Sequence, residues 1–242
     1  MRTIHLIDGE KGGVGKSFVA KAMIQYALDR GLAHTAVETD RSNPDVANIY
    51  RDNCKLAVLS EDEKQAHKSD RIFELALSNP LIVSLPSQVY KPLRSWIEKN
   101  ELLEVAPKYG VKFQKWFVTN GEYDSTKLFI KSLQYYEDKL PHILVRNFGL
   151  CDEWGQVDDD KLLQKLIKKY KVKVIDFPKL GYNERYLINK EQLTFGDAKT
   201  SDKLTILAKQ RVVNFLNSAY AAFDSSGVWQ ESIETGELRE SA

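Results

Sequence analysis

The segment GEKGGVGKS, residues 9–17, combines glycines, lysines and a serine at a spacing that suits phosphate chemistry. Phosphate oxygens bind well to backbone N–H groups at a helix N-terminus when a positive charge is nearby. The glycines let the backbone curl around an anion, Lys16 can reach the β- and γ-phosphates, and the Ser17 hydroxyl can ligate Mg²⁺. The alternative is a glycine-rich turn without a ligand. The spacing favours a site for the phosphates of Mg²⁺-ATP.

The loop departs from the standard Walker A pattern. In G-x-x-x-x-G-K-[ST] the first glycine would fall at Glu10, and an additional lysine, Lys11, precedes the glycines. The form K-G-G-x-G-K-[ST] resembles the deviant Walker A loop of the ParA/MinD group of P-loop ATPases, and a weaker resemblance in organisation covers about residues 2–220. In that group two subunits enclose two ATP molecules, and each signature lysine contacts the partner's phosphates. The resemblance therefore implies an ATP-dependent homodimer in which Lys11 acts in trans, as an arginine finger does; a solvated loop lysine is the alternative.

The resemblance also implies roles for individual residues. Lys11, Lys16 and Asp40 are the expected catalytic residues, and Ser17 and Asp40 are the expected Mg²⁺ ligands or contacts of its water shell. Asp45 is the second candidate for the acidic residue of the switch I segment. Both aspartates could instead be turn or cap residues, because Asn-Pro-Asp strongly favours a turn. The residues expected to bind the nucleotide are Lys11, Gly12, Gly13, Val14, Gly15, Lys16, Ser17, Phe18, Asn147, Phe177 and Pro178.

Three of these residues concern the adenine base. Asn147 ends the apolar run HILVRN, and the resemblance implies that its side-chain amide, which both donates and accepts, hydrogen-bonds the base edge. Phe177 and Pro178 lie in the next strand-to-loop segment, IDFPKLG, where the family brings backbone to the base. A plain turn role for the asparagine stays open.

One position departs from the family pattern. The segment LIVSLPSQ has Ser84 where the resemblance predicts the Walker B aspartate of a D-x-P motif. A neutral hydroxyl holds a Mg²⁺-bound water about half as strongly as a carboxylate does. We therefore expect nucleotide binding with slow hydrolysis.

These residues need a scaffold that places them together. Six apolar runs predict buried strands, and helical patterns alternate with them at about residues 17–31, 61–78, 89–106, 126–139, 158–171 and 202–223. This alternation predicts an α/β fold of the P-loop type, with a mainly parallel sheet and helices on both faces. Ligands in such folds bind beyond the carboxyl ends of the strands. The strands are expected at TIHLID, HTAVETD, PLIVSLP, KFQKWFVTN, HILVRN and VKVIDFP.

Length and composition limit the remaining choices. The 242 residues predict one ATPase domain at 1–224 and a flexible acidic tail at 225–242. A balance of 35 basic against 34 acidic residues excludes the overall basicity of a nucleic-acid coat protein. The two cysteines indicate neither a disulfide scaffold nor a zinc site. Without an apolar signal region or membrane span, the sequence predicts a cytoplasmic protein.

Possible partners follow from charge and from the resemblance. The lysine-rich stretch at 161–173 is a candidate for non-specific DNA binding, although a solvated helix with lysines near its C-terminus explains it equally. The acidic end of the chain argues against the membrane-binding helix of MinD-like members. A relaxase or a centromere-binding protein is a possible protein partner.

The predicted function is that of a ParA-like ATPase in plasmid segregation or conjugative transfer, with a preference for mobilisation and transfer relatives. Two alternatives remain. One is a small-molecule kinase or ligase of the same P-loop branch, which would have no need of Lys11. The other is a protein that uses ATP only to lock an interface, which Ser84 favours.

Overall fold

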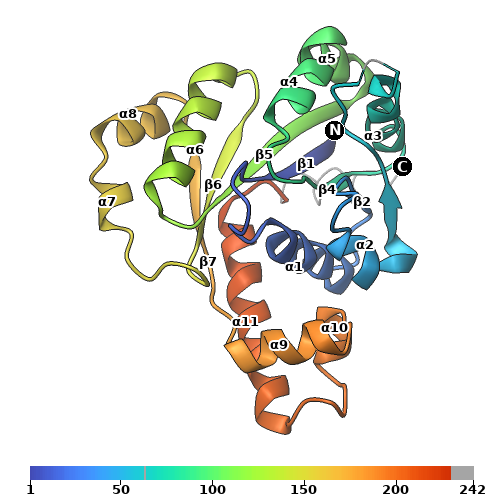
Figure 1. Cartoon of the computed structure of the whole chain (residues 1–242), viewed down its shortest axis with the longest axis vertical. Helices are drawn as coiled ribbons and strands as arrows, with labels where there is room; N and C mark the ends of the chain where they lie inside the picture. The colour runs from blue at the N-terminus through green and yellow to red at the C-terminus, as the bar shows by residue number, and fades with distance from the viewer. Residues whose placement is uncertain (63, 230–242) are drawn as a thin grey trace, which may run out of the picture.

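The computed structural model describes residues 1–62 and 64–229, and these contain a seven-stranded, all-parallel sheet in the order β3-β2-β4-β1-β5-β6-β7. The α/β fold with a mainly parallel sheet is therefore confirmed (Figure 1). All six expected strands are present. The strands are β1 (Arg2–Asp8), β2 (Thr35–Glu38), β3 (Cys54–Leu56), β4 (Leu81–Ser84), β5 (Val111–Thr119), β6 (His142–Asn147) and β7 (Lys173–Phe177).

Helices cover both faces of the sheet because successive strand residues point to opposite sides. In β1, Ile7 packs into a core formed with α1 and α11, whereas Leu6 packs into a core formed with α3, α4 and α5. A smaller core lies between β5, β6, α6 and α8. The helices are α1 (Lys16–Asp29), α2 (Asp45–Ile49), α3 (Asp70–Ala76), α4 (Tyr90–Lys99), α5 (Leu102–Val105), α6 (Tyr123–Tyr136), α7 (Gly155–Asp158), α8 (Lys161–Lys169), α9 (Tyr182–Lys190), α10 (Phe195–Ala198) and α11 (Ile206–Ser225), with short 3-10 turns at Arg51–Asn53, Ala66–Ser69 and Ala106–Tyr109.

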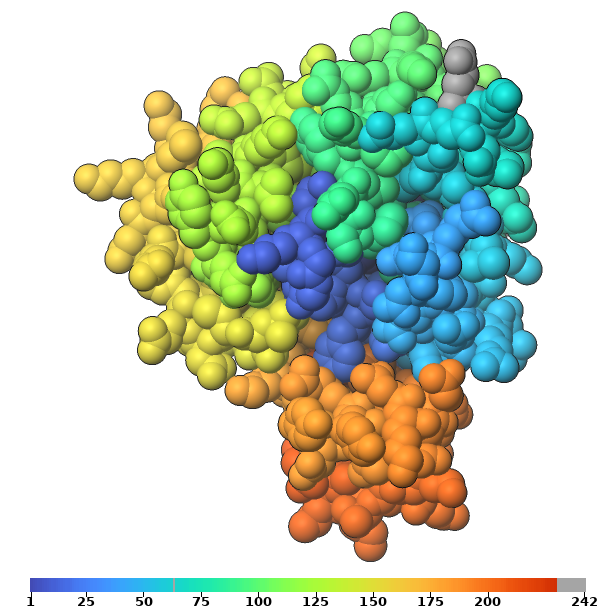
Figure 2. Space-filling view, viewed as in Figure 1, coloured from blue at the N-terminus to red at the C-terminus, as the bar shows by residue number. Residues whose placement is uncertain are grey.

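The segment between β7 and α11 extends the fold beyond the sheet. It contains α9 and α10, and Figure 2 shows it in orange as a projection below the rest of the molecule, with the start of α11 in red. The capping box of Thr194 and Asp197 starts α10, and the Thr205 hydroxyl accepts from the Ala208 N–H at the start of α11. The sequence analysis did not predict α9 and α10.

The chain remains folded beyond α11. Trp229 is buried and stacks on His5 of β1, with 4.3 Å between ring centroids. Burial lowers the pKa of His5 to about 3, so this imidazole is neutral and accepts a hydrogen bond from the Trp116 indole N–H (3.1 Å). Residues 225–229 of the expected tail thus belong to the part of the chain that the structure describes, and 230–242 lie outside the described residues.

Within the described ranges 1–62 and 64–229, none of the helices combines the length and the apolar character that crossing a bilayer requires.

Candidate functional site

The glycine-rich loop connects β1 to α1 at the carboxyl edge of the sheet. Gly13 and Gly15 have φ angles of 79° and 96°, a backbone conformation that residues with a Cβ rarely adopt. A Cβ at Gly15 would also collide with the Asn147 amide. The Lys16 ammonium folds back over the loop and donates to the Lys11 carbonyl (3.2 Å). The loop is therefore an open cradle with one lysine directed inward.

The second lysine lies at the surface. The Lys11 ammonium pairs with the Glu122 carboxylate in the segment between β5 and α6, and both side chains are partly exposed. This hydrogen bond, together with the charge of Glu122, raises the pKa of Lys11, although slight desolvation opposes it. An exposed pair of this kind is weak and easily exchanged for another partner. Lys11 and Lys16 thus have clearly different environments.

A fully buried ion pair lies beneath the loop. One Asp8 oxygen accepts from the Gly9 N–H (2.6 Å) and more weakly from the Glu10 N–H (3.3 Å), and the other lies 2.7 Å from the Lys115 ammonium. Burial alone would raise the pKa of Asp8, but the charge and hydrogen bond of Lys115, together with the two backbone N–H groups, outweigh it and hold this pKa below its ordinary value. Asp8 is therefore ionised and fixes the start of the loop.

The buried pair continues into a chain of hydrogen bonds across β5, α6 and β6. Lys115 donates to the Ser132 hydroxyl (3.0 Å), and Ser132 lies 2.9 Å from His142 Nε2. His142 Nδ1 lies 2.7 Å from the Leu140 carbonyl, so Nδ1 carries the proton and Nε2 accepts from Ser132. Burial, reinforced by the Lys115 charge, lowers the pKa of His142 to about 3 and keeps it neutral. The network thus connects the loop to the centre of the sheet.

Glu10 connects the loop to the segment after β4. Its carbonyl accepts from the Gln88 N–H (2.9 Å), and its carboxylate accepts from the Tyr90 N–H at the start of α4. Burial and the nearby Asp8 charge raise the pKa of Glu10 to about 7. The Glu10 backbone also has a φ of 24°, which is unusual for a residue with a Cβ. Glu10 occupies the position where a standard Walker A loop has its first glycine, and here it links the loop to the segment between β4 and α4.

At the carboxyl end of β2, the buried carboxylate belongs to Glu38, the last residue of the strand, and not to Asp40. Glu38 accepts from the backbone N–H groups of Thr39 and Asp40 (both 2.9 Å) and of Val46 (3.1 Å), and burial raises its pKa to about 7. The Asp40 carboxylate accepts from the N–H groups of residues 42 and 43, a turn role, while remaining close enough for its charge to act on Lys16. Sequence reasoning missed Glu38.

The other two positions singled out in the sequence, Asp45 and Ser84, lie in the segment after β2 and at the end of β4. The Asp45 carboxylate pairs with the Lys21 ammonium of α1 (2.9 Å). Ser84 ends β4 beside Ile7 of β1 and Glu38 of β2, and its carbonyl accepts from the Thr39 N–H and hydroxyl. The position thus lies at the carboxyl edge next to the loop, where the expected aspartate would have supplied a carboxylate.

A cavity of about 620 Å³ extends from the loop glycines to α9. Asn147 lies on its wall, where the amide donates to the Val14 carbonyl (2.9 Å) and accepts from the Gly149 N–H (3.0 Å). Phe177 is fully buried and packs against Phe18, which itself lines the cavity. The cavity is lined by Gly13, Gly15, Phe18, Asn147, Gly149, Leu150, Leu180, Tyr182, Arg185, Tyr186, Asn189 and Lys190, a set that includes Leu180 of the loop after β7 but neither Phe177 nor Pro178.

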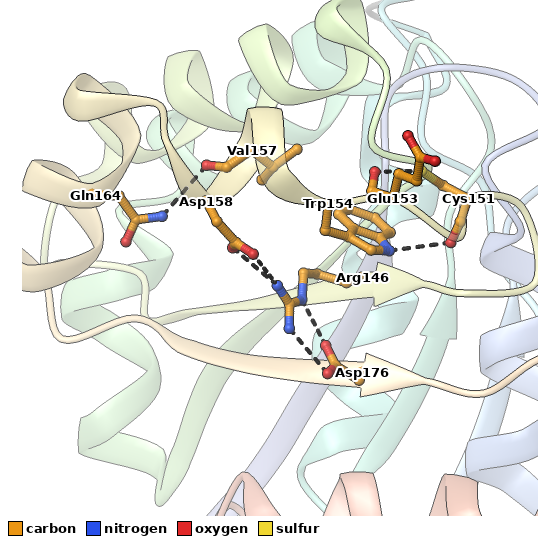
Figure 3. Close-up of polar contacts among 8 residues, drawn as sticks. All are labelled: Arg146, Cys151, Glu153, Trp154, Val157, Asp158, Gln164 and Asp176. Atoms are coloured by element: carbon orange, nitrogen blue, oxygen red, sulfur yellow. Dashed lines mark hydrogen bonds and ion pairs between the residues drawn. The ribbon is translucent and has the colours of Figure 1, made fainter.

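Arg146 stabilises the segment that leads from β6 to α7. Its guanidinium makes a two-pronged bond to Asp176 of β7 (2.6 and 3.0 Å) and contacts Asp158 of α7 (2.9 and 3.0 Å), as Figure 3 shows. It also lies 5.7 Å from the ring centroids of Phe148 and Trp154. This segment supplies Gly149 and Leu150 to the cavity wall, so the contacts of Arg146 help to hold that part of the wall in place.

In residues 1–62 and 64–229 no three His, Cys, Asp or Glu side chains form a group that could hold a metal ion. Ser17 follows Lys16 at the start of α1, where its hydroxyl could ligate a Mg²⁺ ion, and Asp40 is the second residue expected to contact the ion or its water shell. Mg²⁺ is commonly bound by one or two protein side chains together with phosphate oxygens and water.

No protein-family model matches the chain. Among curated proteins, MobD of Acidithiobacillus ferrooxidans is 30% identical over 158 residues, which cover 63% of this chain and 66% of MobD. TraL of Escherichia coli is 22% identical over 244 residues, which cover 94% of this chain and all of TraL. Homology is thus detectable over nearly the whole chain.

The fold is also found in solved structures. The cell division protein MinD of Aquifex aeolicus superposes with a TM-score of 0.51 at 14% identity, covering 90% of this chain and 96% of MinD. MinD in the MinC:MinD complex from the same organism gives 0.53 at 13% identity, with coverages of 90% and 95%. The chain therefore has the fold of the MinD/ParA group of P-loop ATPases with a deviant Walker A loop, and it is a distant homologue of MobD and TraL.

Proposed function

We propose that this chain binds Mg²⁺-ATP in the loop 9–17, forms an ATP-dependent homodimer, and acts as a nucleotide-driven factor in conjugative transfer or segregation of plasmid DNA. The observation that carries the proposal is the different placement of the two lysines. Lys16 is 8% exposed and folded over the cradle, as a phosphate ligand within the same subunit requires. Lys11 is held at the surface by Glu122, where a second subunit can displace that weak partner.

The dimer is tested by replacing Lys11. Size-exclusion chromatography with light scattering on the full chain, with and without Mg²⁺-ATP, should show a dimer only with ATP, and Lys11→Ala should abolish it while ATP still binds. Lys139→Ala is a matched control, because this lysine is exposed and precedes β6, at the edge of the sheet opposite the loop. Persistence of the ATP-dependent dimer in Lys11→Ala would refute the trans role of Lys11.

A slow or absent hydrolysis step is the second candidate, favoured by the position of Ser84. The carboxylates of Glu38 and Asp40 are both occupied by backbone N–H groups, so neither is an evident replacement for the missing aspartate. ATP would then act mainly by locking the dimer. Ser84→Asp should raise the turnover rate if the missing carboxylate limits hydrolysis, and an unchanged rate would contradict this explanation.

The plasmid-transfer setting is supported by the homology to MobD and TraL, relatives of the conjugation and mobilisation class. A relaxase or a centromere-binding protein is the proposed protein partner. Helix α8 is the candidate DNA contact, because it carries four exposed lysines, Lys161, Lys165, Lys168 and Lys169. DNA retention with ATP should weaken steeply as salt rises, and a lack of retention at low salt would exclude this role.

A further inference from the structure

The aromatic residues of α9 have no evident task in the fold. Tyr182 and Tyr186 are 71% and 54% exposed, yet their rings stack on each other with 6.3 Å between centroids and 21° between planes. Both rings line the cavity that begins at the loop glycines. Exposed tyrosines on a cavity wall are well suited to binding, because they offer a large, rigid surface that loses little entropy.

Arg185, between the two tyrosines, is also available to a ligand. It lines the same cavity, and its Nε is enclosed without any hydrogen-bond partner among the described residues. An enclosed donor without a partner is costly, so a ligand that accepts from it would gain free energy. A guanidinium is planar and can stack on a ring as well as donate to it.

The helix that presents these side chains is firmly anchored. On its other side Glu184 is buried and pairs with Arg211 of α11 (2.7 Å), and Ile188 is buried in the main core. The tyrosines and Arg185 therefore form a fixed wall, and binding does not have to order a mobile segment. Figure 2 shows this orange segment directly below the blue and yellow parts of the molecule that contain the glycine-rich loop and the segment after β6.

We propose that Tyr182, Arg185 and Tyr186 form a base-binding wall, on which the purine ring of the bound nucleotide stacks while its phosphates occupy the glycine-rich loop. The proposal rests on the proposed nucleotide binding and deepens it. One end of the cavity is lined by Gly13 and Gly15, so the phosphate chain defines that end, and the nucleoside must extend toward α9. The wall then favours purines over pyrimidines, because the larger ring system stacks over more area.

The test compares two probes on the full chain by calorimetry, ATP and inorganic tripolyphosphate, which lacks the nucleoside. Tyr182→Ala combined with Tyr186→Ala should weaken ATP binding about tenfold or more, the usual effect of removing base stacking, and should leave tripolyphosphate binding unchanged. The corresponding pair of Tyr→Phe changes should retain ATP affinity. Arg185→Met should weaken ATP but not tripolyphosphate. Tyr109→Ala is the control, because this tyrosine has a similar exposure (58%) and lies just before β5, at the edge of the sheet opposite the glycine-rich loop.

Each outcome separates this proposal from the one on which it rests. Wild-type chain that binds neither probe refutes nucleotide binding as a whole. Equal affinity of the wild-type chain for ATP and tripolyphosphate refutes the base-binding wall and leaves the phosphate site intact. ATP affinity of the double alanine variant equal to that of Tyr109→Ala also refutes the wall. Should the double variant fail to fold, as circular dichroism would show, the single change Arg185→Met decides by the same two probes. A preference for ATP over CTP that disappears in the variants would support it.

Discussion

Two ion-pair networks hold loops at the same edge of the sheet, and they differ chiefly in their access to water. The Asp8–Lys115 pair beneath the glycine-rich loop is 0% exposed on both sides. The Arg146 side chain is 18% exposed, and its partners Asp158 and Asp176 are 55% and 52% exposed. The nitrogen–oxygen distances of the ion pairs are short in both networks, at 2.7 Å for Lys115–Asp8 and at 2.9 and 2.6 Å for Arg146 with Asp158 and Asp176. The comparison indicates that burial, rather than the number of contacts, decides how strongly each network constrains its loop.

The buried network cannot lose one partner without a large penalty. Lys115→Met would leave the Asp8 carboxylate ionised and unpaired at a site closed to water. We expect a loss of about 3–5 kcal/mol in the free energy of unfolding. Urea unfolding of the full chain measures it. Adding Asp8→Asn should recover part of the loss, because the uncompensated charge disappears. A loss below about 1 kcal/mol for Lys115→Met would remove the distinction between the two networks.

The hydroxyl in the middle of the buried chain gives the next largest effect. Ser132→Ala removes an acceptor from Lys115 and a donor to His142 Nε2. Buried polar groups left without partners cost about 1–3 kcal/mol. Urea unfolding should show a loss in that range. Ser218→Ala, in which an exposed serine hydroxyl that bonds its own helix backbone is removed, is the control and should change stability little. Equal losses in the two variants would show that the network beyond Lys115 is unimportant.

The buried network also shows what the sequence could reveal. The glycine-rich loop was predictable because all its groups are contiguous, and the strands were predictable from apolar runs. The short β3 was missed because it has only three residues and two of them, Lys55 and Leu56, are exposed. Lys115 lies inside an apolar strand, and a lysine in such a place is itself a signal of a buried carboxylate. The sequence alone does not say which carboxylate pairs with Lys115, because the contact with Asp8 depends on the pairing of β1 with β5 in the sheet.

The acidic residues at the end of β2 and in the segment that follows it illustrate the same limit. The sequence offers Glu38, Asp40 and Asp45 within one short segment. Only tertiary structure decides that Glu38 is buried and accepts three N–H groups, whereas Asp40 forms a turn and Asp45 pairs with Lys21. In the same way, α9 was not predicted because its cavity-facing residues are polar or aromatic and interrupt a simple apolar stripe.

The pH dependence of stability should differ in sign between two carboxylates at the loop, Glu10 and Asp8. The pKa of Glu10 is about 7 in the folded chain and lies above its ordinary value of 4.5. The folded chain therefore binds more protons than the unfolded chain between these values, and this residue lowers stability as pH rises from about 4.5 to 7. Asp8 has the opposite sign, because its pKa is lowered and its contribution is lost only as pH falls.

Glu10→Gln tests this sign, since a glutamine oxygen can still accept from the Tyr90 N–H. We expect the variant to be more stable than wild type by about 1 kcal/mol at pH 8, after allowance for solvent screening, and nearly equal at pH 4. Thermal unfolding at both pH values measures the difference. A variant that gained stability at pH 4 but not at pH 8 would contradict the burial of this carboxyl beside Asp8.

The smallest effect is expected in the exposed network. Asp158→Asn removes one carboxylate from Arg146 but leaves the two-pronged bond to Asp176, and water can solvate the guanidinium at the vacated side. The loss should be below about 1 kcal/mol and should shrink further as salt rises toward 1 M, where screening is strong. The cost of Lys115→Met should be almost independent of salt, because ions do not reach a buried pair. Urea unfolding of both variants at low and high salt makes the comparison direct. If Asp158→Asn cost as much as Lys115→Met, or if salt changed both alike, access to water would not be what distinguishes the two networks.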